Sequence, residues 1–71
     1  MKPSRLNNRV KLARIEKGLN QAQLAERAGV TRQTIGLIEA GGYNPTLKLC
    51  IELARATGKT LDDLFWNTGD H

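Results

Sequence analysis

The chain has 71 residues, of which 39% are hydrophobic and 25% are charged, and its formal net charge at pH 7 is +4. Its one cysteine, Cys50, excludes an intrachain disulfide, and Cys50 with the single histidine, His71, is too small a set for a tetrahedral metal site, so we expect no metal and no cofactor. No apolar run reaches the roughly 18 residues that span a bilayer, and the first ten residues contain no apolar signal-peptide stretch, which favours a soluble protein of the reducing cytoplasm that does not bind membranes.

The charge is distributed unevenly along the chain. Residues 1–32 carry eight Lys or Arg against two Glu, whereas residues 33–71 carry three Lys or Arg against five acidic residues. A basic half suits a surface that faces phosphates, but this pattern fits nucleic acid and anionic lipid alike. The length predicts one domain over residues 1–71. Because a chain this short buries only about 60% of its unfolded surface, we expect a second subunit to add stability.

Glycines and capping residues divide the sequence into helix-length pieces. The first predicted helix spans residues 8–17 and ends before Gly18, because glycine tolerates the left-handed backbone that follows many helices. Asn20 fits the N-cap of a second helix over residues 21–28, with Gln23 three residues later as its capping-box partner. The buried stripe of this second helix is expected to comprise Leu24, Ala25 and Ala28.

The third predicted helix is short, covers residues 32–40 and has Thr31 as its N-cap. About three residues separate it from the second helix, and a turn of this length holds two helices near a right angle. Ile35 and Ile38 are expected to face the core. At 100° per residue the opposite side carries Gln33, Leu37 and Gly36, with Arg32 and Thr34 on its flanks. An exposed leucine among such polar groups is typical of a recognition surface.

The fourth predicted helix runs over residues 47–57, between Thr46 as its N-cap and Gly58. Its charged residues form one narrow stripe, which consists of Lys48, Glu52 and Arg55. Apolar side chains cover most of the remaining circumference, so we expect the helix to be buried on more than one side. In so short a chain the second side is expected to meet another subunit, and Leu49 and Leu53 are the predicted contacts.

A last short helix is predicted over residues 61–64. Phe65 and Trp66 follow it directly and leave three arrangements open. They close the core, they extend a dimer surface, or they pair as a short terminal strand with residues 3–6. We therefore assign residues 61–71 as a candidate dimer element.

Catalysis is not expected from this sequence. The adjacent Asp62 and Asp63 form the one candidate pair, but neighbouring residues on a helix point about 100° apart, and the first-turn position already favours both charges. Cys50 lies in an apolar helix with no histidine near it in the sequence, so we expect a structural thiol. We predict no catalytic residues and no enzyme activity.

The segment from Gln21 to Glu39, QAQLAERAGVTRQTIGLIE, resembles the helix-turn-helix of the phage repressor and Cro-like family, also called the XRE family. The positions that match without an insertion are Gln21, Leu24, Ala25, Gly29, Val30, Ile35, Ile38 and Glu39. The likeness covers all but the two tails and is greatest to compact single-domain members. It implies an all-α fold, a compact five-helix lambda-repressor-like domain with its helix-turn-helix at residues 21–40.

This resemblance implies a sequence-specific regulator of transcription, which we expect to be a repressor that binds double-stranded DNA as a homodimer. In the family, the third helix enters the major groove and the second lies across the DNA backbone. By this analogy Gln33 pairs with adenine, Arg32 pairs with guanine or a phosphate, and Leu37 packs on a thymine methyl group. Thr34 contacts the backbone or a base, and Gly36 either allows a close approach to the duplex or has no role in binding.

The resemblance also implies contacts that position the protein on DNA. Backbone contacts are expected from residues near helix termini and the loop before the fourth helix, namely Asn20, Gln21, Tyr43 and Asn44. General electrostatic attraction is expected from Arg9, Lys11, Lys17 and Arg27. Gln21 is further expected to brace Gln33. Arg14 and Glu39 are expected to form a partly buried ion pair with a structural role, which ties the first helix to the third.

One alternative function stays open, in which the same fold serves as an antitoxin or an adaptor that binds a protein partner. An antitoxin of this kind usually still binds DNA, so that case adds a partner without replacing the function. A pure adaptor does not need Arg32, Gln33 and Thr34 on one face beside a basic half. We therefore favour the DNA-binding regulator.

Overall fold

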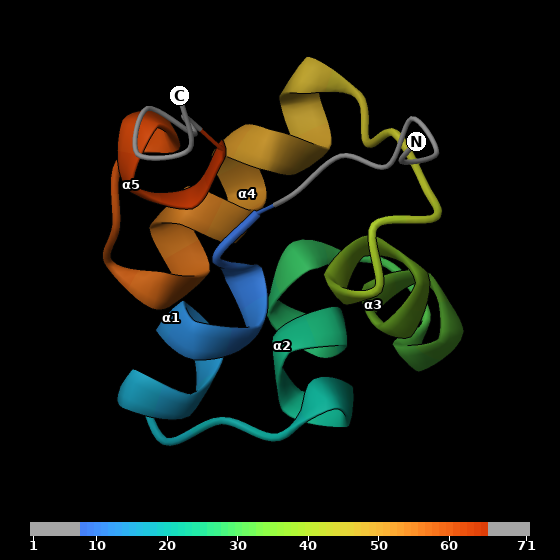
Figure 1. The fold of residues 1–71 in the computed structure, drawn as a ribbon. Helices are drawn as coiled ribbons and strands as arrows, with labels where there is room; N and C mark the ends of the chain where they lie inside the picture. Colours follow the sequence, from blue (N-terminus) through green and yellow to red (C-terminus); the bar gives the residue numbers. More distant parts are fainter. Residues whose placement is uncertain (1–7, 66–71) are drawn as a thin grey trace.

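The computed structural model describes residues 8–65, and this part of the chain folds into five α-helices without a strand (Figure 1). The helices are α1 (Val10–Glu16), α2 (Gln21–Ala28), α3 (Arg32–Glu39), α4 (Leu47–Thr57) and α5 (Leu61–Phe65). Helix α2 packs against α3 and α4, while α1 packs against α3, α4 and α5. This architecture confirms the predicted all-α five-helix fold. None of these helices is both long and apolar enough to cross a lipid bilayer.

The predicted N-caps are confirmed and fix where three helices begin. The side-chain oxygen of Asn20 accepts a hydrogen bond from the backbone N–H of Gln23 at 2.7 Å, and Gln23 Oε1 accepts one from the Asn20 N–H at 2.8 Å. The Thr31 and Thr46 hydroxyl oxygens each accept a hydrogen bond from the N–H three residues later, at 3.2 and 3.1 Å. Each bond satisfies an amide that the first helical turn leaves without a partner.

The tight turn between α2 and α3 depends on Gly29. Its φ of 77° lies in the left-handed region, where an L side chain is strained. The Val30 N–H then donates to the Ala25 carbonyl oxygen at 3.0 Å, which closes the end of α2. Only residues 29–31 separate the two helices, so α3 starts beside α2, as the turn length predicts.

Helix α1 begins at Val10, two residues later than predicted, with Arg9 as its N-cap and Asn8 just before it. The Asn8 side-chain oxygen accepts a hydrogen bond from the Val10 N–H at 3.0 Å, and its amide nitrogen donates to the carbonyl oxygen of Ile38 at 2.8 Å. This side chain therefore ties the start of α1 to the end of α3. At the other end α1 stops at Glu16, one residue earlier than predicted, and Gly18 follows with a φ of 80°.

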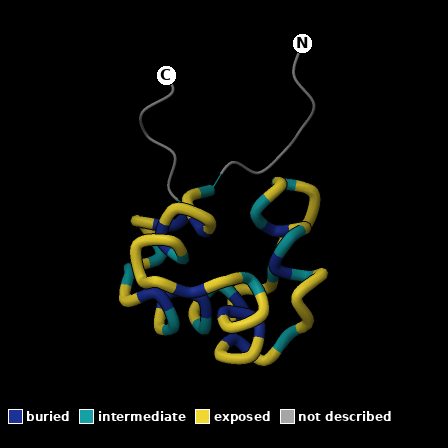
Figure 2. Tube along the Cα trace, turned by 90° about the horizontal axis from the view of Figure 1, so that it is seen from below, coloured by how far each residue is buried: buried dark blue, intermediate teal, exposed yellow. Residues whose placement is uncertain are grey.

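All five helices contribute to a single core (Figure 2). The buried hydrophobic residues are Val10, Ala13, Leu19, Leu24, Ala25, Ala28, Ile35, Ile38, Leu49, Leu53, Ala54 and Leu64. They include Leu49 and Leu53, which are 9% and 0% exposed within one chain. The prediction of these two residues as a dimer contact does not agree with this burial, because both belong to the core of a single chain and leave almost no surface for a second subunit.

The structure decides the position of Phe65 and leaves that of Trp66 open. Phe65 is the last residue of α5, is half-buried and packs against the core, as one of the three open arrangements has it. Trp66 and residues 3–6, on which the strand arrangement depends, lie outside the described residues.

Candidate nucleic-acid interface

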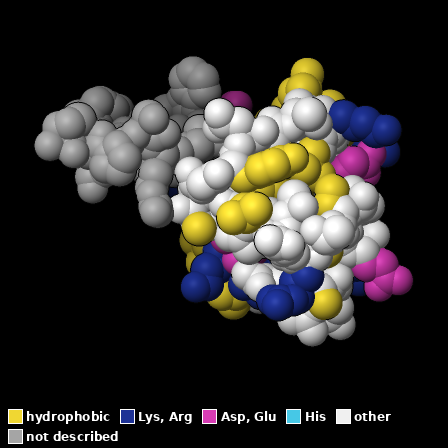
Figure 3. Space-filling view, turned by 90° about the vertical axis from the view of Figure 1, so that its right-hand side faces the viewer, with side chains coloured by type: hydrophobic (Ala, Val, Ile, Leu, Met, Phe, Trp, Pro, Cys, Tyr) yellow, Lys and Arg dark blue, Asp and Glu magenta, His cyan; other side chains and the backbone are white. Residues whose placement is uncertain are grey.

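The outward face of α3 is built by the helical period. Ile35 and Ile38 are 0% exposed and anchor one side of the helix in the core. On the opposite side Arg32 and Gln33 are exposed, and Leu37 keeps 44% of its surface exposed. Figure 3, which looks onto the α3 side of the molecule, shows hydrophobic side chains gathered in the middle of this face and Lys or Arg side chains at its edges. An eight-residue helix thus offers both polar and apolar groups to a partner.

Two polar residues on this face differ in how their side chains are engaged. The hydroxyl oxygens of Thr31 and Thr34 lie 3.0 Å apart and share a hydrogen bond, so the Thr34 hydroxyl belongs to the cap of α3. Within residues 8–65 the Gln33 side chain makes no hydrogen bond. Its amide is therefore available to pair with an external group that both donates and accepts.

Gln21 braces Arg32, and the prediction that it braces Gln33 is wrong. Arg32 Nη1 donates to Gln21 Oε1 at 3.0 Å, while Gln21 Nε2 donates to Glu39 Oε1 at 3.0 Å. The reason is geometric, because residues 32 and 39 are seven positions apart and share one stripe of α3, whereas Gln33 lies 100° around the helix. The start of α2 faces that stripe.

The expected ion pair between Arg14 and Glu39 is present. Arg14 Nε donates to Glu39 Oε2 at 2.7 Å and Arg14 Nη2 donates to Oε1 at 3.3 Å, which gives a two-point contact. The Arg14 and Glu39 side chains are only 11% and 5% exposed. Arg14 Nη1 also donates to the carbonyl oxygen of Leu19 at 2.9 Å. One guanidinium thus joins α1, α3 and the turn that precedes α2.

The residues expected on the DNA backbone surround the start of α2 and the loop after α3. The Asn20 side-chain oxygen is used in the capping box, and Gln21 is half-buried between Arg32 and Glu39. Tyr43 keeps 40% of its surface exposed, and Asn44 is exposed as well. The two loop residues are thus accessible, whereas much of the hydrogen-bonding capacity of Asn20 and Gln21 is used within the protein.

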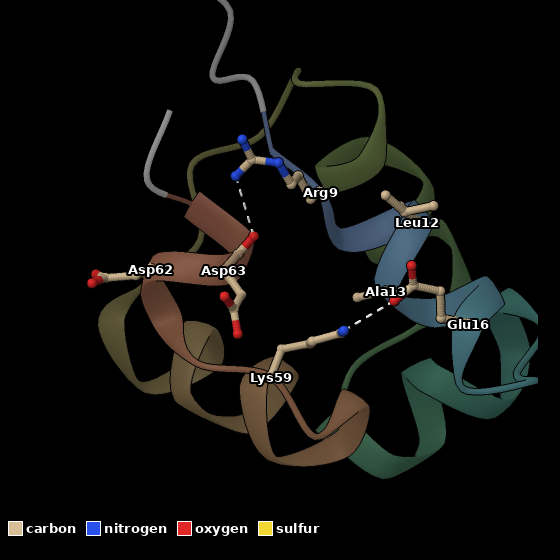
Figure 4. Close-up of a pocket in the computed structure, with 7 residues that line it drawn as sticks. All are labelled: Arg9, Leu12, Ala13, Glu16, Lys59, Asp62 and Asp63. Carbon is tan, nitrogen blue, oxygen red and sulfur yellow. Dashed lines mark hydrogen bonds and ion pairs between the residues drawn. The ribbon is translucent and has the colours of Figure 1, made fainter. Parts of the chain in front are cut away.

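The predicted cationic residues do not form one cluster. Lys11, Lys17 and Arg27 are exposed, but Arg9 turns toward α5, where its guanidinium donates to the carbonyl oxygen of Asp63 at 3.4 Å. Figure 4 shows Arg9 at one end of a shallow pocket between α1 and α5. At the other end Lys59 Nζ lies 2.9 Å from Glu16 Oε1, and this carboxylate raises the pKa of Lys59. One ion pair and one hydrogen bond to a backbone carbonyl thus cross this pocket, and they connect α1 and the residue before it with α5 and the loop that precedes it.

Of the two adjacent acidic residues that line this pocket, Asp63 has a structural role. Asp63 Oδ2 accepts a hydrogen bond from the Thr60 N–H at 3.0 Å, and the Thr60 hydroxyl oxygen accepts one from the Asp63 N–H at 3.0 Å. The bond from the Thr60 backbone lowers the pKa of the Asp63 carboxyl. Asp63 is therefore the second member of the capping box of α5.

Burial raises the pKa of the Cys50 thiol, which opposes formation of a reactive thiolate.

Two groups of residues escaped the sequence analysis. Asn8, which connects α1 with α3, carries the usual signal of a capping residue just before a helix, and that signal was available. Leu47 and Ile51 are 68% and 37% exposed on α4. Their i, i+4 spacing was visible in the sequence, but an apolar helix gives no local sign of which side stays open. No group of three or more His, Cys, Asp or Glu side chains in the described part of the chain could hold a metal ion.

Comparison with known proteins places this geometry in a family. The helix-turn-helix family model matches residues 10–64, which includes α1 to α4 and all of α5 except its last residue, Phe65. The chain is 41% identical over 61 residues to an uncharacterised HTH-type transcriptional regulator, YgzD, of Bacillus subtilis, with 86% of this chain and 92% of that protein covered. It is 40% identical over 53 residues to the immunity repressor protein of Bacillus phage phi105, with 75% of this chain and 37% of that protein covered.

Solved structures show the same likeness. The restriction-modification controller protein C.AhdI of Aeromonas hydrophila is 35% identical and superposes with a TM-score of 0.75, over 80% of this chain and 86% of that one. The family match over residues 10–64 covers the helix-turn-helix at α2 and α3. It also covers both members of the Arg14–Glu39 ion pair. This chain belongs to the XRE family of helix-turn-helix, DNA-binding transcriptional regulators.

Proposed function

We propose that this protein is a repressor of transcription that acts as a homodimer and inserts α3 into the major groove of double-stranded DNA. The observation that carries the proposal is the exposed face of α3, where Arg32, Gln33 and Leu37 stand together. Guanidinium, amide and aliphatic groups are those that contact guanine, adenine and the thymine methyl group in the major groove. The match to a phage immunity repressor supports repression.

Each residue of the exposed face has an assigned contact. Gln33, whose side-chain amide makes no hydrogen bond within residues 8–65, donates through Nε2 to N7 of adenine and accepts at Oε1 from the N6 amino group, which gives a two-point pairing. Arg32 contacts guanine from the first turn of α3, and Leu37 covers a thymine methyl group. Tyr43 and Asn44, which are both exposed on the loop, contact the phosphate backbone.

The amino terminus of α2 supplies a second, sequence-independent contact. Its first amides and the positive end of its dipole favour a phosphate. Gln21 keeps one Nε2 hydrogen beyond its bond to Glu39, and this hydrogen is free to donate to the same phosphate.

The dimer surface that we propose is the open side of α4. Leu47 and Ile51 lie one turn apart and are 68% and 37% exposed, so they replace the buried pair expected from the sequence. Phe65, half-buried at the end of α5, is the third residue of the proposed dimer surface. Binding to two half-sites one turn of DNA apart requires the two copies of α3 in this dimer to lie about 34 Å apart.

The DNA-binding proposal is tested by selecting bound sequences from random duplex DNA. The expected result is a palindromic site with half-sites about 10 base pairs apart, together with a steep fall in affinity as salt rises. Gln33→Ala is expected to lose about 1 to 3 kcal/mol of discrimination at one base pair of each half-site. Selection of no common sequence by the unmodified chain would refute the proposal. Repression follows if the selected site lowers reporter expression when placed across a promoter.

The dimer proposal has its own test in sedimentation at micromolar protein concentration. Leu47→Glu and Ile51→Glu are expected to shift the protein to monomer. Leu12→Glu is the matched control, since Leu12 is a leucine 54% exposed on α1. A control variant that dissociates while both α4 variants stay dimeric would move the interface to α1.

A further inference from the structure

Asn8 completes the carboxyl end of α3, although it lies 30 residues earlier in the chain. After α3 the backbone of Gly41 is left-handed, with a φ of 81°. The Gly41 N–H donates to the Ile38 carbonyl oxygen and the Gly42 N–H to the Leu37 carbonyl oxygen, both at 3.0 Å. A carbonyl oxygen accepts two hydrogen bonds, and at Ile38 the second comes from Asn8 Nδ2 at 2.8 Å. Because Ile38 is 0% exposed, water does not replace this donor.

The Asn8 side chain fits between its two partners in one orientation. Its Oδ1 accepts a hydrogen bond from the Val10 N–H at 3.0 Å, while its Nδ2 donates to the Ile38 carbonyl oxygen. A flipped amide would place donor against donor and acceptor against acceptor, so it would lose both bonds. Asn8 thus fixes the start of α1 against the end of α3.

The peptide group that follows Asn8 is held by α5. The Arg9 N–H, which belongs to this peptide group, donates to the Leu64 carbonyl oxygen at 2.8 Å. The Arg9 guanidinium donates to the carbonyl oxygen of Asp63 at 3.4 Å (Figure 4). A peptide group is planar and rigid from one Cα to the next, so the position of α5 constrains the Cα of Asn8. A continuous path therefore leads from α5 through Arg9 and Asn8 to α3.

The loop that leaves this end of α3 carries two of the proposed contacts to the DNA backbone. Tyr43 and Asn44 are both exposed and directly follow Gly42. The bonds of the Gly41 and Gly42 amides set the direction in which the loop leaves the helix. A change at the Ile38 carbonyl oxygen is therefore passed to the two loop residues.

We propose that Asn8 is a positioning residue that holds Tyr43 and Asn44 in place for contact with phosphates, and that α5 supports Asn8 through Arg9. The part that concerns DNA rests on the proposed function. Phosphate contacts place a protein on the duplex and do not read the bases. Loss of this support therefore weakens binding to every sequence and leaves base preference unchanged. Since coupling between two sites is reciprocal, whatever stabilises α5 also favours DNA binding.

The first experiment needs no DNA and follows the amide signals of Gly41 and Gly42 by NMR. The variant is Asn8→Ser, because the serine oxygen still accepts the Val10 N–H but is too short to reach Ile38. Both glycine signals are expected to shift. Unchanged signals would overturn the positioning role of Asn8, whatever the DNA experiments give.

The same signals test the path from α5. Asp63→Ala removes the capping box of α5 and is expected to shift both glycine signals. Asp62→Ala is the matched control, since it removes an equal charge from the same turn and should leave them in place. In a chain that already carries Asn8→Ser, Asp63→Ala should add no further shift. Shifts that simply add would overturn the path through Asn8.

The second experiment measures affinity for the selected site and for its single-base variants. Asn8→Ser is expected to lower affinity about three- to tenfold for all of them, with base preference unchanged. In a chain that carries Tyr43→Phe and Asn44→Ala, Asn8→Ser should cause little further loss, because it acts through these residues. The folded fraction of each variant is measured by circular dichroism, and affinities refer to folded protein. Unchanged affinity, an altered base preference or a full further loss would each overturn the inference.

These experiments separate the inference from the proposed function. An unmodified chain that selects no sequence refutes the proposed function, and the glycine signals still decide whether Asn8 and α5 position the loop. An unmodified chain that selects a site, with an Asn8→Ser variant of unchanged affinity, refutes only the inference.

Discussion

Replacing Arg14 by methionine is the sharpest test of how this small domain is held together. The change keeps most of the aliphatic length and removes three hydrogen bonds, two to Glu39 and one to the carbonyl oxygen of Leu19. Glu39 is left 5% exposed, with Gln21 Nε2 as its remaining partner. A nearly buried carboxylate without its cation is costly, because the protein interior does not solvate it as water does.

The expected loss can be estimated from these contacts. Removal of one member of a buried pair costs about 3 to 5 kcal/mol, and the residual bond from Gln21 favours the lower figure. A domain of this size has a free energy of unfolding of roughly 4 to 11 kcal/mol. A loss of about 3 kcal/mol would lower the melting temperature by about 12 to 24 °C. The variant is therefore expected to be partly unfolded at 37 °C or close to it.

The assay is urea unfolding followed by circular dichroism at 222 nm, which gives the free energy of unfolding by linear extrapolation. The double variant Arg14→Met with Glu39→Leu should recover part of the loss, because no charge is then left unpaired. Lys59→Met is the control, because it breaks an exposed ion pair. The Lys59 and Glu16 side chains are 36% and 51% exposed, so this change should shift the urea midpoint little. A loss below about 1 kcal/mol for Arg14→Met, as at exposed pairs, would refute the reasoning.

Three further predictions concern the backbone and the helix ends. Gly36→Ala should raise the free energy of unfolding by about 0.5 to 1 kcal/mol, since alanine is the better helix former and its Cβ meets Gln21 Nε2 at 3.8 Å; Gly29→Ala, at a φ of 77°, should lower it by about 1 to 2 kcal/mol. A lower melting temperature in both variants would contradict this account. Thr46→Ala should cost about 1 kcal/mol in urea unfolding, because the first turn of α4 loses the acceptor of the Leu49 N–H. The pKa of Asp63 is lowered in the folded state, so its carboxylate contributes stability that is present above its unfolded pKa and lost as the pH falls through the folded pKa. Asp63→Asn should therefore lose less stability than the unmodified chain between about pH 5 and pH 2, and identical acid titrations by circular dichroism would contradict the shift.

The helix ends were predictable because their causes are local. Asn20, Thr31 and Thr46 cap the helices that the sequence assigns to them, and Gly29 has the backbone angle expected at the turn. Each of these features involves residues no more than five apart. The glycine and capping pattern therefore predicts the order of the helices and their ends to within two residues.

The contacts between helices were less predictable. Whether Gln21 meets Gln33 or Arg32 depends on a rotation of 100° about α3, and only the crossing of α2 and α3 fixes that rotation. The burial of Leu49 and Leu53 similarly depends on which sides of α4 are covered by α2 and α5. An almost uniformly apolar helix does not encode that choice locally, so the sequence did not show which apolar side chains of α4 stay exposed.

The backbone hydrogen bond from the Arg9 N–H to the Leu64 carbonyl oxygen, 2.8 Å long, couples the two ends of the domain. Helix α5 has five residues and is too short to persist in water when it detaches from its neighbours. Release of α5 would therefore expose the Arg9 amide to solvent at the same moment. The deuterium exchange rate of this single amide would then report the free energy of local opening at the carboxyl end, 55 residues further along the chain.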